Sequence, residues 1–206
     1  MIMLCIALLS SYLIGSIPAS YLIARHMGGI DIRRYGSGNV GATNVLRTTG
    51  KLPAVAALAC DILKGVVAVT ILTSFFFRFS IITNRESFQL LMGFMVIFGH
   101  IWPVFLRFRG GKGVATSTGV LLVLCPKVVG IVTVVFLITV VATKYVSLSS
   151  VLSSIALPIT AAYDGRSIRL VIFCITLCLL SCYKHRSNIV RIINKEEPKI
   201  GQKAKT

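Results

Sequence analysis

Long apolar stretches separated by short polar ones run through most of this chain. A transmembrane helix needs about 20 mainly apolar residues, and several stretches approach that length. The pattern predicts an all-α, polytopic integral membrane protein with seven transmembrane helices, folded as a single membrane-embedded domain over 1–206. The expected spans lie at about 2–24, 53–73, 88–105, 114–125, 128–143, 147–163 and 168–183.

Two of these segments are irregular. Glycine, serine and proline within 15–18 interrupt the first span, which a membrane helix tolerates where neighbouring groups satisfy the freed backbone. The segment at 114–125 is short for a span, so a re-entrant hairpin over 114–143 is the alternative. That hairpin would bring Lys127 near the membrane midplane, where a charge is costly, whereas seven spans place it at the outer surface.

The charge balance indicates which partners to expect. The 206 residues are 55% hydrophobic with a mean hydropathy of +0.86, yet the net charge is +16. In a soluble protein such an excess would indicate a nucleic-acid partner. In a membrane protein it indicates basic loops that face the cytoplasm and contact anionic lipids or substrates. We therefore expect a lipid bilayer and no nucleic acid.

The basic residues also predict an orientation. Most of the 22 lysines and arginines lie in the polar segments 25–51, 106–113 and 184–206. The positive-inside rule assigns these segments to the cytoplasm, with the N-terminus outside and the C-terminus inside. A site assembled from them would lie at the inner surface of the membrane.

The segment 99–116, GHIWPVFLRFRGGKGVAT, carries the first chemical signal. Gly110, Gly111 and Gly113 surround Lys112 between two apolar segments. Glycine allows a backbone to approach a ligand closely, and free N–H groups before a helix attract anions. A lysine among them adds a compact cation. This pattern favours a phosphate site; the alternative is a basic loop that only sets topology.

A second polar stretch, 36–50, reads GSGNVGATNVLRTTG and begins with Ser37. Its residues 42–48 can form a two-turn helix after a glycine, with Thr43 and Arg47 on one face. A helix N-terminus, exposed amides and an arginine together favour a second anion site. The alternative is a capped loop without a ligand.

Two familiar patterns in this region are interpreted as coincidences. GSGNVG formally matches the dinucleotide fingerprint G-x-G-x-x-G, but that motif follows a buried strand, and no strand pattern precedes it here. His26 and Asp31 have the H-x-x-x-x-D spacing of another acyltransferase superfamily. The downstream segment that completes that pattern is missing from the sequence.

The third polar stretch is 183–191, YKHRSNIVR. His185 and Asn188 are three residues apart at a helix end, and histidine is the natural general base near pH 7. The alternative is an ordinary histidine at the membrane interface. Within the second apolar segment, Asp61 and Lys64 are also three residues apart and are expected to pair.

Together these runs resemble a known family. GSGNVGATNVLR, DILKG, GHIWPVFLRFRGGKGVAT and HRSNIVR, in this order, are similar to the bacterial acyl-phosphate:glycerol-3-phosphate acyltransferases, the PlsY family. The resemblance implies a multi-pass enzyme of the bacterial inner membrane with a cytoplasmic active site. Such an enzyme moves a fatty acyl group from acyl phosphate to the 1-hydroxyl of glycerol 3-phosphate. Lysophosphatidic acid and orthophosphate result, in the first step of phospholipid synthesis.

The resemblance also implies roles for individual residues. Ser37 and His185 match the catalytic positions, and no cofactor or metal is implied. A serine that forms an acyl-enzyme and a serine that only orients the attack both remain open. Functional coupling to an enzyme that produces acyl phosphate would follow. The expected substrate-binding residues are Asn39, Thr43, Asn44, Arg47, His100, Gly110, Gly111, Lys112, Gly113 and Asn188.

At the tail the chain departs from the family pattern HRxNIxRLxxGxE. Lys195 stands at the glycine position, which puts the local turn in question, while Glu197 keeps the glutamate position. The alternative function is a transporter or channel for a phosphorylated anion, with Asp61 and Lys64 at the membrane midplane. That alternative predicts inverted repeats, and the polar clusters on one side of the membrane favour the enzyme instead.

Overall fold

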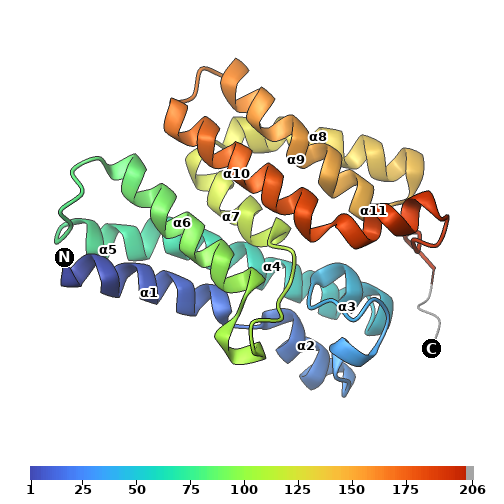
Figure 1. Cartoon of the computed structure of the whole chain (residues 1–206). Helices are drawn as coiled ribbons and strands as arrows, with labels where there is room; N and C mark the ends of the chain where they lie inside the picture. Colours follow the sequence, from blue (N-terminus) through green and yellow to red (C-terminus); the bar gives the residue numbers. More distant parts are fainter. Residues whose placement is uncertain (203–206) are drawn as a thin grey trace. The chain divides into compact units, whose positions relative to one another are not determined.

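The computed structural model describes residues 1–202, which are helical with connecting turns and contain no strand. The helices pack into two compact units, residues 1–123 and 124–202, which we call the N-terminal and C-terminal units. Figure 1 follows the chain through both. Each unit is described by itself.

The N-terminal unit contains the irregular first span and the polar stretch that follows it. Helix α1 (Ile2–Ser16) stops at Ile17 and Pro18, and α2 (Ala19–Gly28) continues in a new direction. The break has a local cause, because Pro18 has no backbone N–H and its ring excludes the helical conformation before it. A short 3₁₀ turn, η1 (Ile32–Arg34), and the two-turn helix α3 (Ala42–Thr48) complete this part.

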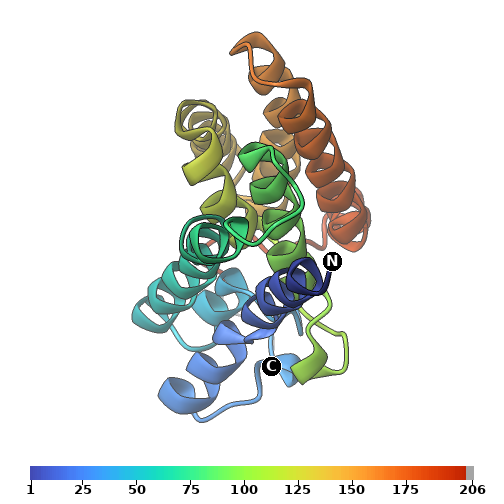
Figure 2. The same cartoon turned by 90° about the vertical axis from the view of Figure 1, so that its left-hand side faces the viewer.

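Three longer helical segments complete the N-terminal unit. They are α4 (Lys51–Val67), continued by the π-helical turn η2 (Ala68–Leu72) and α5 (Thr73–Phe77), then α6 (Arg85–Ile101) and α7 (Val114–Leu124). A 3₁₀ turn, η3 (Val104–Leu106), lies between α6 and α7. Helices α1 and α6 run side by side, as two perpendicular views show (Figures 1 and 2).

Glycines allow these helices to approach closely. A methyl group added to Gly15 would overlap the carbonyl of Val96 on α6, and one added to Gly99 would overlap that of Tyr12 on α1. Between α4 and α7, a methyl group on Gly119 would overlap the carbonyl of Ile62. Helices in a bilayer associate through such backbone approach, because lipid provides no hydrophobic driving force between them.

The C-terminal unit consists of four helices. Helix α9 (Val146–Tyr163) packs against both α8 (Pro126–Thr143) and α10 (Ile168–Lys184), and α11 (Arg186–Ile193) follows α10 after a bend of 54°. Lys127 lies 2.6 Å from the carboxylate of Asp164 at the end of α9. This ion pair connects the start of α8 to the α9–α10 turn.

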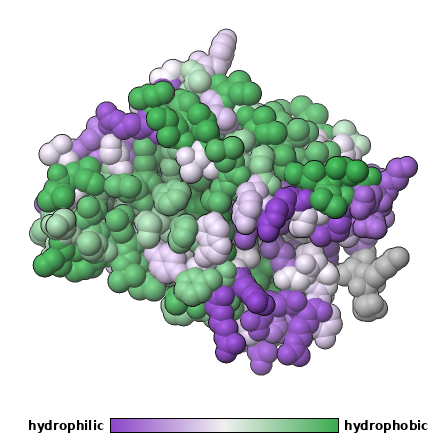
Figure 3. All heavy atoms as spheres, in the orientation of Figure 1, coloured by the Kyte–Doolittle hydropathy of each residue, from purple (hydrophilic) through white to green (hydrophobic). Residues whose placement is uncertain are grey.

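The helix lengths confirm the multi-pass, all-helical prediction. Within residues 1–202, five helical segments are long and apolar enough to cross a membrane, and the bent α10–α11 pair would make six. Helix α7 has 11 residues, so seven spans remain a prediction. In Figure 3, hydrophobic residues cover α1 and α6, and hydrophilic ones gather around α2 and the chain after it.

Local predictions were confirmed in part. The first segment breaks within the predicted 15–18, and α3 spans the predicted 42–48. The third segment starts earlier than expected, at Arg85, because the Asn84 side chain accepts a hydrogen bond from the Ser87 amide (2.9 Å) and caps the helix. The second segment is longer at both ends, since its helix starts at 51 and continues through the π turn to 77.

We predict that Gly119→Ala lowers the thermal unfolding midpoint of the detergent-purified protein, because the added methyl group would separate α4 from α7. Overpacking of this kind costs about 1–3 kcal/mol. The matched control is Gly130→Ala on α8, where a methyl group meets no atom within 4 Å. There the higher helix propensity of alanine should leave the midpoint unchanged or raised. Equal effects of the two substitutions would contradict the proposed close approach.

Candidate active site

Ser37 lies in a loop that one buried side chain organises. Asn44 on α3 is 1% exposed, and its Oδ1 accepts a hydrogen bond from the Ser37 amide at 3.0 Å. Its Nδ2 donates to the carbonyls of Tyr35 and Asn39, both at 3.1 Å. Asn44 therefore holds the loop backbone from within, and the Ser37 side chain is left exposed at its tip.

The glycine beside Ser37 is needed for this contact. Gly36 has φ 60°, a left-handed conformation that side chains rarely adopt, and a methyl group there would overlap Oδ1 of Asn44. Further along, Gly41 caps α3, and Thr43 and Arg47 lie one turn apart on that helix, half-buried as is Asn39. The structure thus supplies the short helix that the second polar stretch predicts.

Asp31 forms an ion pair with a neighbouring residue, Arg33. Its carboxylate accepts hydrogen bonds from the Arg33 guanidinium at 2.9 and 2.7 Å. These bonds lower the pKa of Asp31 to about 2. A carboxylate held in this way agrees with the interpretation of the His26–Asp31 spacing as a coincidence.

The glycine loop, residues 110–113, follows the η3 turn. Arg107 and Phe108 have φ values of 52° and 61°, so the chain turns sharply through two left-handed residues. The amide of Gly110 then donates to the carbonyl of Ile101 at 3.2 Å, and the amide of Gly111 donates to that of His100 at 3.2 Å. Two backbone hydrogen bonds therefore return the loop to the end of α6.

Side chains could not replace the glycines in this loop. A methyl group on Gly110 would overlap Pro103, and one on Gly111 would overlap the His100 ring and the Val40 carbonyl. The Val40 contact also brings the Ser37 loop next to the glycine loop, so two of the three predicted polar stretches meet in the N-terminal unit. The half-buried Lys112 follows Gly111 directly, before Gly113 and α7.

His185 and Asn188 belong to the C-terminal unit, so their meeting with Ser37 remains a prediction. His185 is 2% exposed at the end of α10, and its Nδ1 lies 2.9 Å from the Ser181 carbonyl. A carbonyl can only accept, so this contact places the ring proton on Nδ1 and the lone pair on Nε2. In this tautomer Nε2 is the nitrogen that could accept a proton.

Asn188 is held by Glu197, whose role the sequence did not reveal. Asn188 Nδ2 donates to Oε1 of Glu197 at 2.7 Å, and the Ser147 hydroxyl donates to the same oxygen at 2.8 Å. Arg191 Nε donates to Oε2 at 2.9 Å. Burial alone would raise the pKa of Glu197, but these hydrogen bonds and the charge of Arg191 bring it below its ordinary value.

The turn before Glu197 forms despite the departure from the family pattern. Lys195 has φ 61°, the left-handed conformation that glycine favours. The amides of Glu196 and Glu197 both donate to the Arg191 carbonyl, at 2.7 and 3.1 Å. The chain therefore keeps the turn that a glycine would make, with a strained lysine in its place.

Comparison with known proteins identifies the family. A model of the family described as glycerol-3-phosphate acyltransferase matches residues 5–195. The chain belongs to this family. A glycerol-3-phosphate acyltransferase of Desulforamulus reducens is 42% identical over 196 residues, which are 95% of this chain and 94% of that protein. A glycerol-3-phosphate acyltransferase of Bacillus cytotoxicus is 44% identical over 195 residues, which are 93% of this chain and 92% of that protein.

Two solved structures of the family are also similar. Both are described as PlsY (YgiH), an integral membrane glycerol 3-phosphate acyltransferase. The glycerol 3-phosphate form has a TM-score of 0.85 and 35% identity and covers 96% of each chain. The form described as that of lysophosphatidic acid has a TM-score of 0.83 and 34% identity, with 96% of this chain and 95% of that chain covered.

We predict that Lys195→Gly stabilises the protein. A left-handed non-glycine residue costs about 1–2 kcal/mol, which the substitution removes, while the greater freedom of glycine in the unfolded chain offsets part of the gain. The unfolding midpoint in detergent should rise. The reverse control is Gly165→Ala. Gly165 also has a left-handed φ of 68° and has open space around it, so alanine there should lower the midpoint through backbone strain alone. A drop for Lys195→Gly would be inconsistent with strain at this turn.

A second prediction concerns acid. Because the pKa of folded Glu197 lies below its ordinary value of 4.5, its contribution to stability is present above pH 4.5. That contribution is lost as the pH falls through the folded pKa. Glu197→Gln should therefore flatten the dependence of the unfolding midpoint on pH below about pH 5, whereas Glu196→Gln, at an exposed neighbour, should not. Parallel curves for wild type and Glu197→Gln would exclude this role.

Proposed function

We propose that this protein transfers a fatty acyl group from acyl phosphate to the 1-hydroxyl of glycerol 3-phosphate. The products are lysophosphatidic acid and orthophosphate. The observation that carries the proposal is the similarity, at 35% and 34% identity over 96% of this chain, to two PlsY structures described by a substrate and a product of this reaction. An enzyme that supplies acyl phosphate would be its functional partner.

The proposed topology has seven spans in the bacterial inner membrane, with the N-terminus outside and the C-terminus in the cytoplasm. Bacterial relatives and the positive-inside distribution of lysine and arginine support it. In this topology the segments 25–51, 106–113 and 184–206 lie together on the cytoplasmic side. The predicted single domain over 1–206 belongs to the same proposal; its last four residues lie outside the described range.

The proposed chemistry requires two phosphates to be held near one hydroxyl. Lys112 and Arg47 suit this task, since fixed cations stabilise phosphate oxygens without reorganisation. Gly110, Gly111 and Gly113 shape the loop around Lys112, and the amides of Gly110 and Gly111 bond to the end of α6. Asn39, Thr43 and Asn188 provide further polar groups. Asn44 belongs to the same site through the backbone that it holds, because its side chain bonds to the loop itself.

The transfer itself needs one proton acceptor. The 1-hydroxyl oxygen attacks the acyl carbonyl carbon, the bond to the phosphate oxygen breaks, and orthophosphate leaves. His185 is suited to take the hydroxyl proton, because its Nδ1 contact leaves the lone pair on Nε2. We favour a Ser37 that orients the attack without forming an acyl-enzyme. The mixed anhydride is already activated, so the proposal needs no cofactor.

The transporter alternative has less support. Asp61 and Lys64 bond to each other and to groups of the broken first span, which is a structural use of both charges. Membership in a family of acyltransferases also favours the enzyme.

We expect purified protein to release orthophosphate from acyl phosphate when glycerol 3-phosphate is present. Ser37→Ala, His185→Ala and Lys112→Ala should each lower the rate by about 10²-fold or more, because each removes a group that acts on the reacting atoms. Ser10→Ala removes a hydroxyl that donates within α1, to the Ile6 carbonyl at 2.8 Å. It is the matched control and should keep full activity. Full turnover by Ser37→Ala would refute its catalytic assignment. If mass spectrometry found an acyl group on the protein when glycerol 3-phosphate is omitted, the reaction would proceed through an acyl-enzyme and the proposal of direct transfer would be wrong.

A further inference from the structure

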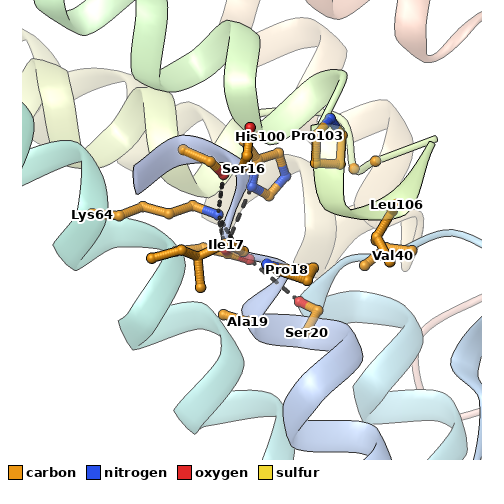
Figure 4. Close-up of a pocket in the computed structure, with 14 residues that line it drawn as sticks. Ser16, Ile17, Pro18, Ala19, Ser20, Val40, Lys64, His100, Pro103 and Leu106 are labelled. Carbon is orange, nitrogen blue, oxygen red and sulfur yellow. Dashed lines mark hydrogen bonds and ion pairs between the residues drawn. The ribbon is translucent and has the colours of Figure 1, made fainter. Parts of the chain in front are cut away.

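A buried ion pair faces the break between α1 and α2. Asp61 and Lys64, one turn apart on α4, have their charged groups 2.7 Å apart and are 2% and 7% exposed. Figure 4 shows the Lys64 side chain extending from α4 to the break. Both charges lie within an apolar helical segment of 27 residues, where isolated charges are costly.

Each charged side chain forms hydrogen bonds with one side of the break. Lys64 Nζ donates to the carbonyls of Gly15 and Ile17, both at 3.1 Å, at the end of α1. The carboxylate of Asp61 accepts from the Ser20 hydroxyl at 3.3 Å, in the first turn of α2. A cation at a helix C-terminus and an anion at a helix N-terminus both match the helix dipoles. Lys64 therefore supplies a donor to the Gly15 carbonyl at the helix end and a second donor to the Ile17 carbonyl, which also accepts the Ala19 amide at 3.0 Å.

His100 connects this ion pair to the glycine loop. Its Nδ1 lies 3.4 Å from Oδ1 of Asp61, and its side chain is 8% exposed at the end of α6. Its backbone carbonyl accepts the Gly111 amide, and Gly111 packs directly against its ring. These groups line a cavity of about 10 Å³ that also touches Gly110. A displaced His100 would therefore displace the loop.

We propose that Asp61, Lys64 and His100, which we call the charge cluster, are positioning residues for the glycine loop. The cluster fixes the broken span and, through His100, the backbone of residues 110–113 that precedes α7. The proposal rests on the proposed function, in which this loop binds a substrate phosphate. It assigns His100 an indirect role, in place of the direct substrate contact expected from the sequence.

The arrangement of the chain explains why charges are used here. An apolar pair of similar size would avoid desolvation, and such replacements are often neutral or stabilising in other proteins. At this position, however, the Gly15 carbonyl would then lose its donor from α4, and the Ile17 carbonyl would be left with the Ala19 amide. Unsatisfied backbone groups are costly away from water. Because the break lies next to the glycine loop, the side chains that bond to the carbonyls of the break also help to fix the position of the loop.

The test compares kinetic constants. His100→Leu leaves the Asp61–Lys64 pair intact but removes the contact with Asp61, and should raise the KM for at least one phosphate-bearing substrate by about tenfold. The kcat should change less than about threefold, because the lost interaction is uniform binding. His100→Asn, which retains a polar group near the Nδ1 position, should recover part of the affinity. Asp61→Asn and Lys64→Met should show the same pattern.

The matched control is Gln89→Leu. Gln89 also makes a hydrogen bond between packed helices of the N-terminal unit, from α6 to the Val69 carbonyl at 3.0 Å, but at the other end of α6. It should leave both kinetic constants near those of wild type. An unchanged KM in His100→Leu, or an equal rise in Gln89→Leu, would overturn the proposal.

A second measurement is independent of activity. Amide hydrogen exchange of the segment 103–113 should become faster in His100→Leu, while exchange in α8 stays unchanged. Uniformly faster exchange would indicate a merely structural effect and count against positioning, as would unchanged exchange. If wild type released no orthophosphate, the proposed function would fail, and faster exchange confined to 103–113 would still support the positioning role.

Discussion

The structure of the N-terminal unit depends on how a broken helix satisfies its main-chain carbonyls inside a membrane. Water cannot bond these groups in hydrocarbon, so a side chain of the protein must do so. Lys64 donates hydrogen bonds to two of these carbonyls. Asp61 neutralises its charge and accepts a hydrogen bond from the Ser20 hydroxyl on the other side of the break. A chemical requirement of the backbone thus explains two charges in an otherwise apolar segment.

Buried polar side chains hold residues of the proposed site in both units. Asn44 organises the loop that carries Ser37, and Glu197 orients Asn188 and Arg191. Each bonds to several groups at once, so replacing it would leave several buried partners unsatisfied. The residues proposed to contact substrates are therefore positioned by buried side chains that each make several hydrogen bonds. Glycines such as Gly36 and Gly111 permit the close contacts between these segments.

Much of the fold followed from local pattern. Apolar length located the helices, Pro18 located the first break, and a glycine followed by helix formers located α3. The spacing of Asp61 and Lys64 predicted their pairing, because residues three apart share a helix face. The π turn and the early start of α6 were missed, since they depend on a shifted hydrogen-bond register and on an asparagine cap.

The sequence by itself determined the membrane class, the helices, the family resemblance and the residues that could carry the chemistry. Only the tertiary structure decided what Asn44, His100 and Glu197 do. Their partners lie at separations from 5 residues, for Asn44 and Asn39, to 50, for Ser147 and Glu197. Hydropathy and helical spacing report contacts within one element. A hydrogen bond between elements depends on where folding brings them, and local pattern does not contain that information.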